Sequence, residues 1–153
     1  MRYILLVLVA GCAWYTNKLT GKEDQDIEAS CRQSVGAMVA TVDTRTPAQV
    51  PTARWDCQYQ NPKGEAVVDS ITLTVAGAQS TASGVDSFGQ RIAANGPAGA
   101  DRVSYSSSSE SAVVLRADGA SLVGEGRWFV PGPADQPAEK ATCFATKVVC
   151  VAR

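Results

Sequence analysis

The residues of this 153-residue chain with the most obvious chemistry are its five cysteines. Cys12 ends an apolar stretch near the N-terminus and stands apart from the other four. Those four are Cys31, Cys57, Cys143 and Cys150. One isolated cysteine and an even set downstream predict an exported, lipid-anchored protein with two disulfides. Four buried free thiols in a reducing compartment are the alternative.

The first 20 residues have the features of an export signal or an anchor. Arg2 supplies a positive charge, and residues 3–10 form the apolar run of a signal peptide. Residues 9–12 (Val-Ala-Gly-Cys) resemble the bacterial lipobox, and this resemblance implies that Cys12 is diacylated and becomes the first mature residue. An uncleaved apolar anchor flanked by aromatic residues is the rival interpretation, although a span normally needs about 20 apolar residues. The third interpretation is that this segment is a buried core helix of a cytosolic protein.

Two segments follow from this interpretation. Residues 1–20 are a lipoprotein signal peptide or a membrane anchor with a short stalk, and residues 21–153 are a single domain with a modest core. Either tether places the domain outside the cytoplasm, anchored to the cell membrane. The net charge of −1 and the lack of a basic cluster argue against nucleic-acid binding. The expected partners are therefore the membrane and an envelope protein.

Hydrophobic periodicity predicts a helix and then a strand in the first half of the domain. Apolar residues recur at helical spacing over 26–41, with Cys31 on the apolar stripe. Trp55, Cys57 and Tyr59 alternate with polar residues, which is typical of a half-buried strand. Because Cys31 and Cys57 would both point inward on adjacent elements, we expect them to form a disulfide. Four cysteines nevertheless permit three pairings.

The remaining chain predicts a mixture of strands and helices. Turns are expected at 61–64 (Asn-Pro-Lys-Gly) and 118–119 (Asp-Gly). The expected strands are 67–75, 103–105, 112–117, 121–123 and 127–130, and the expected helices are 80–95 and a C-terminal segment around 141–152. For that last segment a strand is the alternative; in a helix Cys143 and Cys150 would be about 10.5 Å apart, too far to bridge. The predicted fold class is α+β: an antiparallel sheet with helices packed on one side, stapled by disulfides.

The sequence lacks most catalytic machinery. It contains no histidine, which removes histidine-dependent nucleophilic schemes and the usual zinc sites. No cysteine pair has C-x-x-C spacing, and no phosphate-binding glycine motif occurs. We therefore predict no catalytic residue, no cofactor and no metal site.

Aromatic side chains and one carboxylate are the candidates for a binding site. Residues that could line a ligand groove are Trp55, Tyr59, Tyr105, Trp128 and Phe129, with Trp55 and Tyr59 as the named ligand-binding candidates. Packing in the core is the alternative for all of them. Asp69 lies on the apolar face of its strand. It is either a functional acid with a raised pKa or a carboxylate at a bulge or beside an arginine.

Cys31 together with the Trp55-Asp56-Cys57 segment resembles a pattern in small secreted or membrane-anchored proteins of high-GC Gram-positive bacteria. In those proteins a lipobox or single anchor precedes an α+β domain. The resemblance implies an extracytoplasmic location rather than an activity. With the missing catalytic motifs, it suggests a non-catalytic, membrane-tethered module that binds a protein or cell-envelope partner. A small-ligand-binding lipoprotein that serves a transporter or sensor is the alternative.

Overall fold

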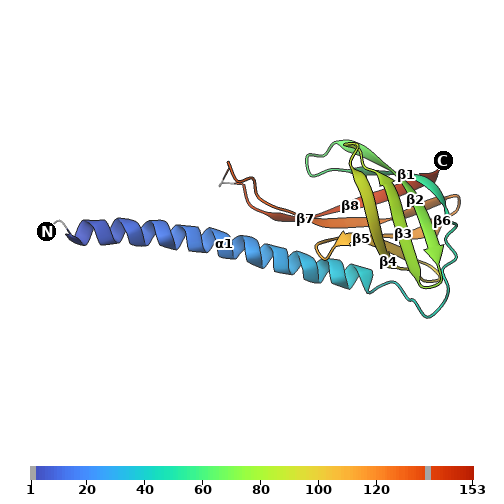
Figure 1. Ribbon diagram of the computed structural model, residues 1–153, viewed down its shortest axis with the longest axis horizontal. Helices are drawn as coiled ribbons and strands as arrows, with labels where there is room; N and C mark the ends of the chain where they lie inside the picture. The colour runs from blue at the N-terminus through green and yellow to red at the C-terminus, as the bar shows by residue number, and fades with distance from the viewer. Residues whose placement is uncertain (1–2, 137–138) are drawn as a thin grey trace.

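The chain forms one long helix followed by a closed antiparallel β-barrel (Figure 1). The computed structural model describes residues 3–136 and 139–153, with only the backbone for residues 3–20. The elements are α1 (Tyr3–Val39), β1 (Ala53–Gln60), β2 (Ala66–Ala76), β3 (Gln79–Val85), β4 (Arg91–Pro97), β5 (Val103–Ser108), β6 (Ser111–Asp118), β7 (Ser121–Val130) and β8 (Thr142–Ala152). Each strand pairs with the next, and β8 returns to pair with β1. No helix within the described residues is both long and apolar enough to cross a membrane.

The predicted α+β class is therefore wrong. The segment 80–95, expected as a helix, forms the β3–β4 hairpin, and the C-terminal segment forms β8. A sheet with helices on one side would leave two sheet edges unpaired, whereas the β1–β8 pairing closes the sheet on itself. The strand at 55–60 and the turns at 61–64 and 118–119 are confirmed, with Gly64 and Gly119 at positive φ. The predicted helix at 26–41 is the C-terminal part of the longer α1.

One end of the barrel is packed solid. The fully buried side chains at this end belong to four strands: Leu73, Val103, Leu115 and Leu122. Residues 40–52, which connect α1 to β1, pass over this end, and Val50 joins the same core cluster. Because this end is filled and covered, any cavity inside the barrel has to open at the opposite end, where the β1–β2, β3–β4 and β5–β6 turns lie.

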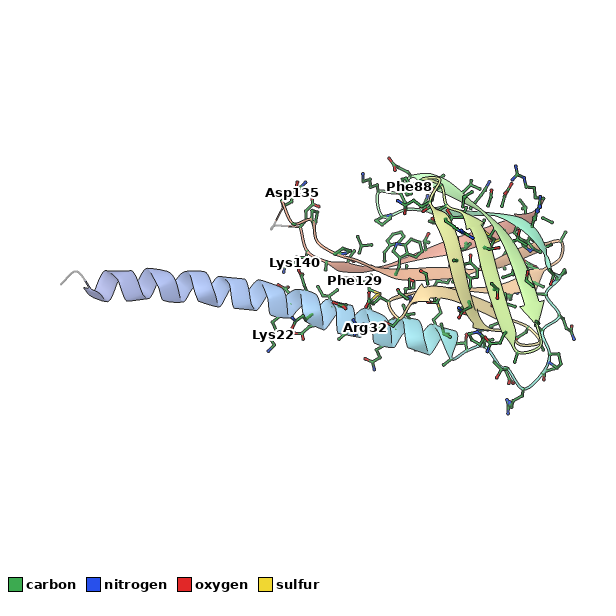
Figure 2. The ribbon with its side chains drawn as sticks, viewed as in Figure 1. Lys22, Arg32, Phe88, Phe129, Asp135 and Lys140 are labelled. Atoms are coloured by element: carbon green, nitrogen blue, oxygen red, sulfur yellow. A yellow bond between two sulfur atoms is a disulfide. The ribbon has the colours of Figure 1, made fainter. Side chains whose placement is uncertain are left out.

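Helix α1 packs on the outer wall of the barrel and not within it. Cys31 and Val35 lie against Ala112 of β6, with Phe129 of β7 at the edge of this small cluster. A disulfide joins Cys31 to Cys143 on the outer face of β8. Figure 2 shows how the C-terminal half of the helix lies along β7 and β8.

The second disulfide joins Cys57 to Cys150 inside the barrel. These two residues lie directly opposite each other in the β1–β8 register, and both are fully buried. The predicted Cys31–Cys57 disulfide is therefore wrong. Cys31 and Cys57 do both face apolar surroundings, but the barrel wall separates the helix cluster from the interior. Two disulfides in one domain are consistent with an oxidising, extracytoplasmic environment.

The direction of α1 places the N-terminus on the same side as the open end of the barrel. Near its C-terminal end the helix lies beside the closed end, and farther back Arg32 pairs with Glu110 in the β5–β6 turn. Still closer to the N-terminus of α1, Glu23 pairs with Lys140 of the β7–β8 connection, with a distance of 2.6 Å between Lys140 Nζ and Glu23 Oε1. The helix then continues beyond the barrel on the side of the open end (Figures 1 and 2).

Candidate functional site

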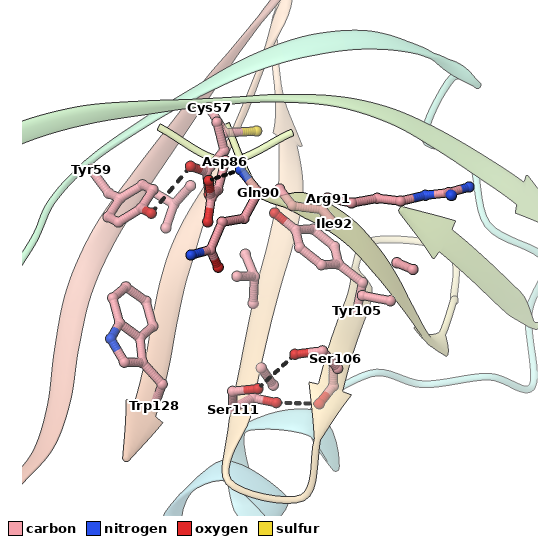
Figure 3. A pocket seen from close by; sticks show the side chains of 17 residues that line it. Cys57, Tyr59, Asp86, Gln90, Arg91, Ile92, Tyr105, Ser106, Ser111 and Trp128 are labelled. Atoms are coloured by element: carbon pink, nitrogen blue, oxygen red, sulfur yellow. Dashed lines mark hydrogen bonds between the residues drawn. The ribbon is translucent and has the colours of Figure 1, made fainter. Parts of the chain in front are cut away.

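A cavity of about 420 Å³ occupies the open end of the barrel (Figure 3). Its lining comes from seven strands and the β3–β4 turn, so residues distant in sequence meet there. The lining residues that matter for recognition are Tyr59, Asp69, Gln90, Ile92, Tyr105 and Trp128. The volume falls in the range of small-molecule sites, about 300–1,000 Å³. An eight-stranded barrel is also just wide enough to hold one small ligand.

The alternation of side chains along each strand explains why these residues face the cavity. Tyr59 lies two residues beyond the buried Cys57, and therefore projects to the same inner face of β1. Trp128 of β7 points inward because Gly126 leaves room for it: a Cβ on Gly126 would crowd the Trp128 ring. The rings of Tyr59 and Trp128 meet edge to face, with their centroids 5.5 Å apart. This geometry fixes one aromatic wall of the cavity.

Asp69 of β2 supplies a carboxylate to the wall of the cavity. The Tyr59 hydroxyl donates a hydrogen bond of 3.2 Å to Asp69 Oδ1, and the Ser87 backbone N–H donates one of 3.0 Å to the same oxygen. The second oxygen, Oδ2, accepts no hydrogen bond from the part of the chain that the structure describes, and it is not enclosed by protein. Asp69 therefore has an acceptor available to a ligand.

Partial burial raises the pKa of Asp69 above its ordinary value. The hydrogen bonds from Ser87 and Tyr59 act in the opposite direction, because they stabilise the ionised form, and the charge of nearby Asp86 raises the pKa further. No basic group contributes to lowering it. The Asp69 carboxylate is thus held in a site that disfavours its own negative charge.

Tyr105 of β5 brings a second hydroxyl group to the cavity. Its side chain is only 8 % exposed, and burial followed by the charge of Asp69 raises the pKa of its hydroxyl. Among the described residues no group forms a hydrogen bond with this hydroxyl, which points from the far wall toward the region of Asp86 and Gln90 (Figure 3). Asp69, Tyr59, Tyr105 and Gln90 thus place polar atoms around one apolar space.

The β3–β4 turn forms the rim above Asp69. Asp86 accepts hydrogen bonds from the backbone N–H groups of Phe88 (2.9 Å) and Gln90 (2.7 Å), and Gly89 completes the turn at a φ of 78°. These hydrogen bonds hold the turn so that Gln90 lines the cavity and Phe88 lies at the tip of the turn, where it is 75 % exposed. Arg91 also borders the cavity, but its guanidinium extends away from these groups (Figure 3).

The structure unites some of the residues that the sequence singled out and separates others. Tyr59, Tyr105 and Trp128 converge on the cavity, whereas Trp55 is buried in the core and Phe129 packs near α1 on the outer wall. Asp69, a weaker candidate, lies at the centre of the site. Cys12 falls in the part of α1 for which no side chains are described, so lipidation at Cys12 stays a prediction.

The sequence does not identify Gln90 and Ile92 as site residues, because its pattern predicts a helix over 80–95 where the structure has the β3–β4 hairpin. A strand assignment would have put Ile92 and Ala94 on one face, and both do line the cavity. The signal that could have indicated it is the 86–89 segment (Asp-Ser-Phe-Gly), which combines a side-chain acceptor with a glycine, as turns often do.

No protein-family model matches this chain, and no curated protein or solved structure is significantly similar to it. Function has to be argued from the site. No group of three or more metal-ligating side chains occurs among the described residues. The cavity combines apolar and aromatic walls with a few convergent polar atoms, which is the composition of a small-molecule binding site.

A second hollow, of about 660 Å³, lies on the outer face of the barrel between the end of α1 and strands β6–β8. Although its volume is larger, its border is rich in charged side chains: Arg102, Arg116, Asp118, Glu125 and Lys147. Several of these are exposed to solvent along the outer strand faces. It therefore lacks the aromatic enclosure of the interior cavity, which remains the better candidate.

We expect the substitution Asp69→Asn to raise the thermal stability of the protein at neutral pH. The amide oxygen can still accept the hydrogen bonds from Tyr59 and Ser87, while the half-buried charge disappears. Because the pKa of Asp69 is higher in the folded state than its ordinary 3.8, protonation stabilises the fold as the pH falls through the folded pKa. The advantage of asparagine should therefore be largest at neutral pH and vanish on acidification. Melting temperatures measured across this range test it, and a variant less stable than the parent at neutral pH would contradict it.

Proposed function

We propose that this protein is an extracytoplasmic barrel that binds one small molecule with an apolar body in the cavity at its open end. The observation that carries the proposal is the meeting of Tyr59, Tyr105 and Trp128 with Asp69 around about 420 Å³ of space inside a closed barrel. The polar groups would orient the ligand, and the apolar walls would supply most of the binding free energy. This corresponds to the small-ligand alternative of the sequence analysis.

A tether at the N-terminus would turn the open end toward the membrane. Helix α1 passes the β5–β6 turn and the β7–β8 connection and continues on the side of the cavity. At a rise of 1.5 Å per residue, the 11 residues from Glu23 back to Cys12 span roughly 16 Å. A ligand drawn from the membrane, or delivered to it, would then travel only a short distance to the cavity.

The tether has its own test. Cells expressing the full chain would be labelled with a radioactive fatty acid, and we expect label on the parent protein and none on the Cys12→Ala variant. Label retained by the variant would reject lipidation at Cys12. Unlabelled parent protein recovered in the membrane fraction would instead favour an uncleaved apolar segment.

A protein-binding role is the second candidate, and one feature favours it. Phe88 at the tip of the β3–β4 turn is 75 % exposed, and Val85 and Val68 on the adjoining outer strand faces are also exposed. An apolar patch beside the mouth of a binding cavity would serve as the contact for an envelope protein that exchanges the ligand. Substituting Phe88→Ser should abolish such an association and leave binding in the cavity unchanged.

Binding of a neutral fluorescent probe tests the proposed function. N-phenyl-1-naphthylamine is aromatic, uncharged near neutral pH and more fluorescent in apolar surroundings. We expect saturable binding at one site per chain by the oxidised protein, and loss of that binding after reduction and unfolding. A titration that shows no saturable binding, or stoichiometry well above one, would contradict a single enclosed cavity.

A further inference from the structure

The Asp69 carboxylate has no counter-charge among the side chains that the structure describes. The ion pairs of the described residues involve neither Asp69 nor Asp86, although both line the cavity. Partly buried charges in proteins are normally paired, because desolvation penalises an isolated ion. Arg91 is the one basic residue among the described residues that line the cavity, and its side chain extends away from Tyr59 and Asp86 (Figure 3). The cavity therefore has an excess of negative charge.

Aromatic rings surround the same space. Tyr59 and Trp128 form one wall, held edge to face, and Tyr105 forms another. The negative face of an aromatic ring attracts a cation, by about 0.5–1 kcal/mol at an exposed site and about 2 kcal/mol or more when the pair is desolvated. Trp128 is the strongest ring of the three for this purpose. Carboxylate and aromatic rings thus favour the same sign of charge in a ligand.

We propose that the ligand carries a positively charged nitrogen, which lies beside Asp69 within the rings of Tyr59, Tyr105 and Trp128, while its apolar part contacts Ile92 and Val113. The proposal rests on the function proposed above and specifies the ligand class: a small organic cation with an apolar substituent. The free Oδ2 of Asp69 accepts a hydrogen bond from the cation or forms an ion pair with it. The Tyr105 hydroxyl is available as a further hydrogen-bond acceptor. An anion would be repelled by Asp69 and Asp86.

Three probes of nearly the same shape test the proposal by calorimetric titration of the oxidised protein. Phenyltrimethylammonium is the cation, tert-butylbenzene is its neutral isostere, and benzenesulfonate is an anion of similar size. The Asp69→Asn variant removes the charge and keeps an oxygen acceptor for Tyr59 and Ser87. Asp118→Asn, at the exposed β6–β7 turn, is the matched control.

We expect the parent protein to bind the cation at least about tenfold more tightly than the neutral isostere, and to bind the anion more weakly than either. Asp69→Asn should remove this preference and still bind N-phenyl-1-naphthylamine, while Asp118→Asn should behave as the parent. If the isostere or the anion binds as tightly as the cation, or if Asp69→Asn keeps the preference, the cationic ligand class is wrong and the cavity remains a binding site. If neither the three probes nor the naphthylamine binds, the proposed function is itself wrong.

Discussion

Removing the Cys57–Cys150 disulfide should lower the free energy of unfolding by about 4.5 kcal/mol, on the chain-entropy estimate for a loop of 93 residues. The bridge lies at the pairing that closes the barrel. This β1–β8 pairing extends over four residue pairs, whereas the β7–β8 pairing extends over ten. Fewer backbone hydrogen bonds therefore hold β8 to β1 than hold it to β7. The paired substitution to alanine therefore removes the covalent link across the pairing that closes the barrel.

Denaturant unfolding of the Cys57→Ala/Cys150→Ala variant measures this loss. The matched control is Cys31→Ala/Cys143→Ala, which removes a bridge of similar loop length on the outer wall. We expect the control to release α1 from β8 and to keep binding of N-phenyl-1-naphthylamine, since its bridge lies outside the cavity. Non-reducing peptide mapping of the parent protein checks the connectivity, and a peptide containing both Cys31 and Cys57 would contradict the structure.

Filling the cavity should abolish binding of the neutral probe. Ile92 is partly exposed inside the mouth of the barrel, and the indole of an Ile92→Trp variant would occupy the space between Tyr105 and Trp128. Because the new side chain enters open space and not a packed core, we expect a change in stability of at most about 1 kcal/mol. The affinity for N-phenyl-1-naphthylamine should fall by at least about tenfold, which corresponds to about 1.4 kcal/mol.

The control for this variant is Val151→Trp. Val151 is 46 % exposed on the outer face of β8, near the closed end of the barrel, and receives the same added ring. We expect it to bind the probe as the parent protein does. Equal affinity of Ile92→Trp and Val151→Trp, with both variants folded by circular dichroism, would place the bound probe outside the cavity.

The elements that sequence alone identified have large apolar side chains on their inner faces. Trp55, Cys57 and Tyr59 give β1 a clear period of two, and Gly64 marks the hairpin that follows it. Strand β3 lacks this signal. Its inner face carries Ser80, Ala82 and Gly84, small residues that fit the crowded barrel interior and leave no hydrophobic alternation.

By chance, the apolar residues of segment 80–95 have the spacing of a helix. Val85, Phe88 and Ile92 recur at helical intervals, but Val85 and Phe88 are exposed and only Ile92 faces inward. The C-terminal strand was missed for a related reason, because Phe144 and Val148 are four residues apart and suit either structure. In a strand an odd separation places two residues on opposite faces, which is why Cys143 and Cys150 bridge to different partners.

The site was predictable in its chemistry but not in its geometry. The aromatic residues and Asp69 could be recognised from the sequence, since an acid on an apolar strand face is unusual. Their convergence depends on the closure of β1 against β8, which joins residues 93 apart in the chain and leaves no local signal in the sequence. Helix packing against the outer wall is equally non-local, so the assignment of Cys31 to the inner core could not be corrected without the fold.

The most direct test of ligand binding inside the barrel is a map of chemical-shift changes in the isotope-labelled protein, residues 1–153, as N-phenyl-1-naphthylamine is added. We expect the largest changes at Tyr59, Ile92, Tyr105 and the indole N–H of Trp128, all of which line the cavity. Changes confined to Met38, Arg102, Val123 and Val149, which border the outer hollow, would contradict a binding site within the barrel.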